Sequence, residues 1–193
     1  TQMLWVNLIM DTFAAMALSS LPADKKVLHD KPRNPNSHII DRDMVYRIMG
    51  TGLLFFIILA GLWQLLGHTN IKSFDQLFTI DFSGIMATNL FEFESNRLSG
   101  FDHGVFFSIF VMMQFWNLFN AKYFRTDRSL TLDIIDLFRN PKKVKESFSA
   151  GFIWISLVIV LGQILIVTFA GPLFNVSPLS VDDWLLILLI TSP

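Results

Sequence analysis

An aspartate and an asparagine within an apolar stretch are the residues of this sequence best suited to chemistry. Asp11 is the only formally charged residue in the stretch 2–21, and Asn7 precedes it by four residues. In an α-helix, this spacing puts both side chains on one face. Their carboxylate and carboxamide oxygens suit calcium, which takes about six to eight oxygen ligands. Two side chains are too few, so the other ligands must be backbone carbonyls, water or groups on other helices.

The spacing alone leaves three interpretations of this pair open. A carboxylate near the middle of a membrane costs at least about 2.5–3.5 kcal/mol on insertion scales, and such residues usually face a bundle interior or a polar cavity. Asn7 and Asp11 therefore suit an interhelical polar clamp, a proton relay or a cation site. In a secondary cation antiporter or a channel, Asp11 would be the coupling carboxylate.

The composition indicates a membrane protein. Of the 193 residues, 52% are hydrophobic and 16% are charged, against roughly 25% charged in soluble domains. Since a spanning helix needs about 20 mostly apolar residues, we predict an all-α membrane protein, a polytopic helix bundle. The predicted helices are 2–21, 44–67, 104–124, 147–171 and 184–193, the last of them truncated.

Basic residues alternate between the connecting segments. Segments 22–47 and 122–146 hold 13 of the 15 Lys and Arg residues, whereas 68–103 holds two and 172–183 none. By the positive-inside rule, basic loops are cytoplasmic. The predicted cytoplasmic loops are 22–43 and 125–146, and the predicted exterior loops are 68–103 and 172–183. Because the basic residues are divided between two loops and form no single face, we expect no nucleic-acid partner.

One eight-residue motif surrounds Asp11 and reads WVNLIMDT from Trp5 to Thr12. It resembles the sixth transmembrane helix of the P-type calcium-transporting ATPases, and Met before the Asp is similar to the plasma-membrane type. Further similarities keep their order and spacing over essentially the whole chain. They are Lys31-Pro32-Arg33-Asn34-Pro35, Val111-Met112-Met113-Gln114 with Asn117 and Asn120, Phe138-Arg139-Asn140-Pro141, Ser177-Pro178-Leu179 and Asp183-Trp184.

The resemblance implies the sixth to tenth helices of an ATP-driven calcium pump in the plasma membrane, with Asn7 and Asp11 as ligands of the transported calcium. It also implies that the first five helices and the cytoplasmic domains, which bind ATP and magnesium, lie outside this sequence. No DKTGT-like phosphorylation motif or Gly-rich phosphate loop occurs here. Because both ends of the sequence interrupt apolar runs, we expect an excerpt of a longer polypeptide without catalytic residues of its own.

Two further positions bear on the number of ions that the resemblance implies. Met10 has a thioether where the reticulum type of pump has a hydroxyl, and Gln114 is neutral where that pump has a Glu. Sulfur is a poor ligand for calcium, which prefers oxygen. We therefore predict one calcium ion per cycle, and for Gln114 an interhelical hydrogen bond rather than ligation.

The charge pattern makes a topology prediction that can be tested in intact cells. Single cysteines introduced at Lys31 and at Asp75 should react with a membrane-impermeant thiol reagent from opposite sides, because basic loops stay cytoplasmic. Labelling of both positions from the same side would refute the assignment.

Overall fold

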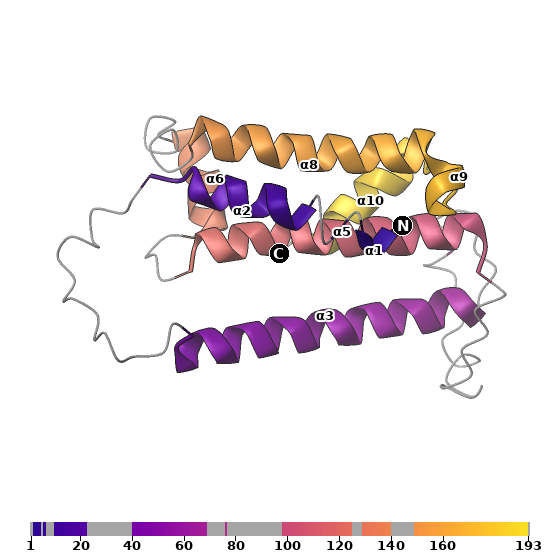
Figure 1. Cartoon of the computed structure of the whole chain (residues 1–193), viewed down its shortest axis with the longest axis horizontal. Helices are drawn as coiled ribbons and strands as arrows, with labels where there is room; N and C mark the ends of the chain where they lie inside the picture. The colour runs from indigo at the N-terminus through magenta and orange to yellow at the C-terminus, as the bar shows by residue number, and fades with distance from the viewer. Residues whose placement is uncertain are drawn as a thin grey trace.

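The computed structural model describes residues 2–4, 6, 10–22, 40–68, 76, 98–124, 129–139 and 149–192. All regular elements in this part are helical, which confirms the predicted all-α class. They are α1 (Gln2–Leu4), α2 (Asp11–Ser19), α3 (Arg42–His68), α5 (Gly100–Lys122), α6 (Leu130–Arg139), α8 (Ala150–Phe169), α9 (Gly171–Phe174) and α10 (Val181–Thr191). The long helices lie side by side in a bundle (Figure 1).

The core lies where α2, α5, α8 and α10 meet. Helix α5 contacts all three other helices, and its Val111 and Met112 are fully buried together with Phe152 of α8 and Ile187 of α10. Among the described elements, α5 is the one against which helix α3 packs extensively. One of its anchors is Trp63, whose ring meets Phe106 edge-on with centroids 5.3 Å apart.

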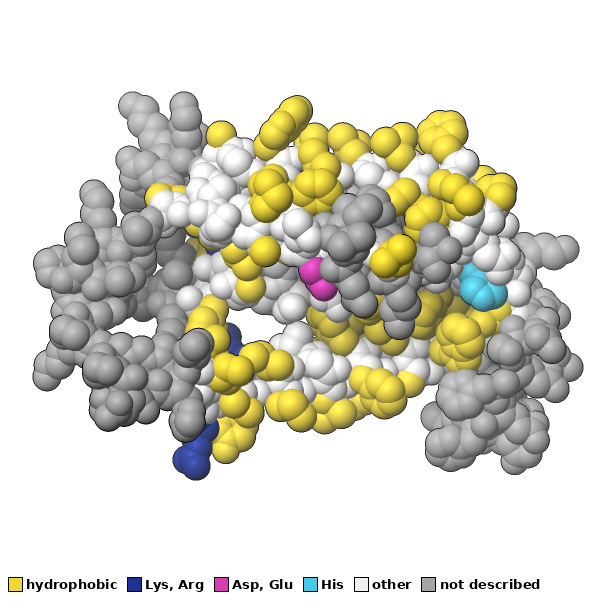
Figure 2. Space-filling model, in the orientation of Figure 1, with side chains coloured by type: hydrophobic (Ala, Val, Ile, Leu, Met, Phe, Trp, Pro, Cys, Tyr) yellow, Lys and Arg dark blue, Asp and Glu magenta, His cyan; other side chains and the backbone are white. Residues whose placement is uncertain are grey.

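Three helices of the described part are long and apolar enough to cross a membrane. They are residues 42–67 of α3, the whole of α5 and the whole of α8, and an 18-residue window within each has a mean hydropathy of 2.0, 1.3 and 2.5, respectively. Apolar side chains cover the outer surfaces of α3 and α8 in Figure 2. On α3 these include Leu53, Leu54, Phe56 and Ile57, each more than half exposed. Such surfaces suit contact with lipid.

The helix ends alternate between the two ends of the bundle (Figure 1). The carboxyl ends of α2 and α5 lie at the same end as the amino ends of α3 and α8. The elements that flank the two basic segments therefore meet at one end, as the predicted topology requires. The side of the membrane on which this end lies stays a prediction.

Two helices begin earlier than their apolar runs predict, because both have a capping box. Helix α5 begins at Gly100 instead of residue 104, since Ser99 Oγ accepts from the Asp102 backbone N–H (3.2 Å) and Asp102 accepts from Ser99 N (2.8 Å). Ser180 and Asp183 form the same arrangement at the start of α10, which begins at Val181 instead of 184. Reciprocal capping stabilises a helix start regardless of hydrophobicity.

The remaining boundaries differ less from the prediction. Helix α3 extends the predicted 44–67 by two residues at the start and one at the end. The predicted helix 147–171 is shorter as α8, because Ser149 Oγ accepts from Phe152 N (3.0 Å) and so caps it at Ala150. After α8 the chain makes the short α9, which ends at Asn175 in the left-handed conformation.

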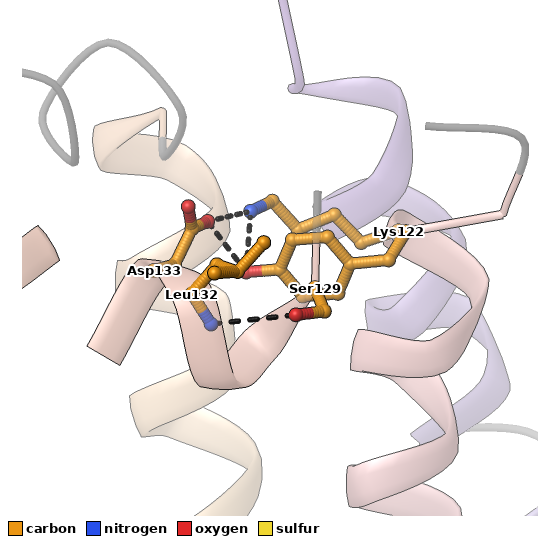
Figure 3. Close-up of polar contacts among 5 residues, drawn as sticks. Lys122, Ser129, Leu132 and Asp133 are labelled. Carbon is orange, nitrogen blue, oxygen red and sulfur yellow. Dashed lines mark hydrogen bonds and ion pairs between the residues drawn. The ribbon is translucent and has the colours of Figure 1, made fainter. Parts of the chain in front are cut away.

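Helix α6 lies within the segment 125–146, which the sequence analysis treats as a loop. Its Asp133 is buried against the end of α5, where it accepts from Tyr123 Oη (2.6 Å) and pairs with Lys122 Nζ (3.3 Å) (Figure 3). The Lys122 ammonium also lies 4.2 Å from the centroid of the Tyr123 ring. A charged hydrogen-bonded pair therefore fixes α6 to the end of a spanning helix.

Removing one member of this pair should destabilise the protein strongly. Asp133→Ala removes a carboxylate that pairs with the buried Lys122 ammonium, and breaking a buried pair costs about 3–5 kcal/mol. We expect a clear fall in the melting temperature of the purified intact protein. The double variant Lys122→Met/Asp133→Leu should recover most of it, because neither charge remains buried. An unchanged melting temperature for Asp133→Ala would contradict the role of this pair.

Candidate functional site

The first apolar segment, predicted as a helix over 2–21, is helical at residues 2–4, 6 and 10–19 of its described part. Its described residues form α1 and α2, and Val6 and Met10 between them lie in wide π-helical turns. Such turns widen the regular hydrogen-bond ladder and occur frequently at functional sites. In transporters, departures of a membrane helix from regular geometry can provide backbone carbonyls for cations. Asp11 directly follows this irregular region as the first residue of α2.

Hydrogen bonds hold the segment against α8 and α9 at both of its ends. Near its start, Gln2 Nε2 donates to the carbonyl oxygen of Phe174 (2.7 Å). Near its end, Ser20 Oγ lies 2.9 Å from Ser149 Oγ. The helices approach closely there, since a Cβ on Gly151 would lie 3.0 Å from the Ser20 Cβ. The turns at Val6 and Met10 therefore lie between two hydrogen-bonded contacts, one at Gln2 and one at Ser20.

Asp11 itself lies on an exposed face of α2. With Thr12, Ala15, Met16 and Ser19 it lines a shallow hollow, whose described lining residues all belong to α2. Within the described part of the chain its carboxylate has neither a hydrogen bond nor an ion pair. A carboxylate in this setting is available to a cation or to a donor from another element.

The character of this α2 face differs from the lipid-like surface of α3. Four of its five hollow-lining residues are small or polar, whereas α3 exposes Leu, Phe and Ile. Small and polar residues let helices approach closely within membranes, and an intramembrane carboxylate normally faces protein or a polar cavity. The open face of α2 therefore suits a neighbouring helix better than lipid.

The other residues singled out from the sequence have different outcomes. Asn7 lies outside the described residues. Met10 is 3% exposed and packs into the core, away from the exposed face that carries Asp11. Gln114 is half-buried on α5 and lines a groove between α3 and α5 together with Thr51, Asn117 and Asn120.

Gln114 and Asp11 do not share a pocket in the described part of the chain. The interhelical hydrogen bond predicted for Gln114 is also not formed with any described residue. No three His, Asp or Glu side chains come together within the described ranges. Among the described residues, no further His, Asp or Glu therefore joins Asp11 in a cluster that could hold a metal ion.

Sequence reasoning missed several buried polar groups. Asp102 and Asp183 are carboxylates within helices, although Asp11 was the only charge that the apolar runs predicted inside a span. Gln163 of α8 is completely buried, as is Ser108 of α5, and Ser156 of α8 is 8% exposed. A lone glutamine in the uncharged run 147–171 was the available signal for Gln163.

Comparison with known proteins decides the family. The sequence profile described as "Cation transporting ATPase, C-terminus" matches residues 1–193. The chain belongs to the cation-transporting P-type ATPases. In an alignment of 190 residues that covers 95% of this chain, it is 32% identical to plasma membrane calcium-transporting ATPase 2 of Oreochromis mossambicus. It is also 32% identical to plasma membrane calcium-transporting ATPase 3 of Homo sapiens over 194 residues, and 33% to plasma membrane calcium-transporting ATPase 1 of Oryctolagus cuniculus over 189.

This chain spans only a small part of those cation-transporting ATPases. It covers 14%, 13% and 13% of their respective lengths. This chain therefore corresponds to the C-terminal membrane part of the ATPases, and most of each relative lies outside it. The predicted resemblance to the plasma-membrane type agrees with the names of these relatives.

Proposed function

We propose that this chain is the C-terminal membrane part of an ATP-driven calcium pump in which Asp11 and Asn7 bind the transported ion. The observation that carries the proposal is the position of Asp11. It is a carboxylate inside an apolar segment, next to wide helical turns, on a small and polar face that is open for further ligands.

Calcium is the proposed ion on two grounds. The relatives that match over 95% of this chain are named as calcium-transporting ATPases. Carboxylate, carboxamide and backbone carbonyl oxygens are also the hard ligands that calcium prefers. The same names support a plasma-membrane location.

The remainder of the intact protein would supply what this chain lacks. We propose that a preceding helix packs on the open face of α2 and adds a carboxylate to the ion site. Cytoplasmic domains would bind ATP and magnesium and form an aspartyl phosphate, whose hydrolysis drives alternating access. The catalytic steps therefore belong outside this chain, while Asp11 and Asn7 grip the ion.

Membership of the ATPase family disfavours the alternative of a secondary antiporter or channel. The geometry further favours one calcium ion per cycle. Met10 is buried in the core, and Gln114 lines a separate groove. Two divalent ions near a single carboxylate would repel each other strongly at low dielectric.

Neutralising the carboxylate tests the proposal. Asp11→Asn in the intact pump should abolish calcium-dependent phosphorylation from ATP at normal calcium levels, because a desolvated charge that loses its partner costs about 3–5 kcal/mol. That loss corresponds to at least about a hundredfold in calcium affinity. Phosphorylation from inorganic phosphate, which uses the calcium-free form, should survive.

A matched control is Asp182→Asn, which neutralises another exposed acid in the first turn of a helix. This variant should keep wild-type calcium dependence. If Asp11→Asn also kept wild-type affinity, Asp11 would not be a calcium ligand.

A further inference from the structure

Two fully buried polar side chains within the bundle have no hydrogen-bond partner among the described residues. Ser108 on α5 and Gln163 on α8 are both 0% exposed. The Ser108 hydroxyl and both amide atoms of Gln163 lack a hydrogen bond in the described part of the chain. Leaving a buried polar group unsatisfied costs about 1–3 kcal/mol, so these groups call for a partner.

The two residues lie at the same level of the bundle. Helices α5 and α8 run in opposite directions (Figure 1), and the rings of Phe119 and Phe152 make contact with centroids 5.4 Å apart. Ser108 is eleven residues before Phe119, and Gln163 is eleven residues after Phe152. At about 1.5 Å per residue, both residues are about 16 Å from the ring contact.

The same measure places Gln163 beside the wide turns of the first segment. Gln163 is fourteen residues, or about 21 Å, from Ser149, whose hydroxyl contacts that of Ser20. Met10 is ten residues, or about 15 Å, from Ser20. Gln163 thus lies about one helical turn beyond Met10, toward Val6. Val6 and Met10 are buried at 4% and 3%, so they face the interior as Gln163 does.

We propose that Ser108 and Gln163 form a binding site for one buried water molecule, which links the Gln163 amide to the backbone of the wide turns. A backbone carbonyl that accepts one helical hydrogen bond keeps a second lone pair for another donor, and a buried water typically makes about three hydrogen bonds. A metal ion does not fit this site, because two neutral side-chain oxygens are too few for calcium.

This water gives Gln163 a positioning role that rests on the proposed function. Asp11 is the residue after Met10, so a hydrogen bond from behind fixes the backbone that presents the carboxylate. Ser108 and Gln163 do not touch the ion. They hold the irregular region in the conformation that binds it.

Substitution of Gln163 by an apolar residue of similar size separates this role from plain packing. In the intact pump, Gln163→Met should lower both the melting temperature and the apparent calcium affinity, the latter by about two- to tenfold, the value of one hydrogen bond. Phosphorylation from inorganic phosphate should persist. If Gln163 has no partner, the same substitution removes an unsatisfied polar group, raises the melting temperature and leaves the calcium affinity unchanged. That result would overturn the proposal.

Two further variants keep the test sharp. Ser108→Ala should lower the calcium affinity as Gln163→Met does. In the Gln163→Met background, Ser108→Ala should cause no further loss, because both residues bind the same water. Additive losses of calcium affinity would contradict the site. Ser156→Ala is the matched control, a buried α8 hydroxyl two turns away that lines a hollow with Phe115 and Phe119. It should leave calcium affinity unchanged, and an equal shift would show a packing effect only.

The melting temperature separates this inference from the proposed function, because it needs no calcium. If Asp11→Asn retained wild-type calcium dependence, the assignment of Asp11 as an ion ligand would fail. The melting temperature of Gln163→Met would still test the water site in that case. If Asp11→Asn abolished calcium dependence and Gln163→Met behaved as wild type, the water site alone would fail.

Discussion

A carboxylate carried within an apolar segment is the constraint on which the rest of this structure depends. Asp11 has no counter-charge among the described residues, and its face of α2 is the small and polar one. A charged group at membrane depth is tolerated where protein, water or an ion compensates it. The opposite face of α2, where Ala17 is fully buried, packs onto α8 and α5, so only the face with Asp11 is left open among the described helices. We expect the cation and its other ligands on this open face of α2.

The irregular backbone beside Asp11 needs support that a regular helix would not. The contacts of Gln2 with Phe174 and of Ser20 with Ser149 fix the segment at its two ends. Between them, the water proposed to lie on the buried Gln163 amide would hold the backbone next to Met10. This arrangement would keep the backbone beside Asp11 in position, since a site is only as well defined as the groups that support it.

The sequence predicts the helical class and the spans well, because uncharged runs of about 20 residues have few alternatives to a membrane helix. It predicts boundaries poorly where polar caps decide them, as Ser99 with Asp102 does for α5. Helix α6 escaped prediction because its anchor, the pair of Asp133 with Lys122, joins residues of different elements. Asp11 stood out as a charge, whereas Gln163 is uncharged and its burial depends on packing. Asn7 stays a prediction, as it lies outside the described residues.

The most direct test of the ion site is a density map of the intact pump with calcium bound, compared with a map obtained in a calcium chelator. The account predicts a single calcium-dependent density in the membrane region, with an Asp11 carboxylate oxygen at about 2.3–2.6 Å from its centre. It should disappear in the chelator. A calcium-dependent density beyond ligand distance of Asp11, or a second one beside Gln114, would contradict the account.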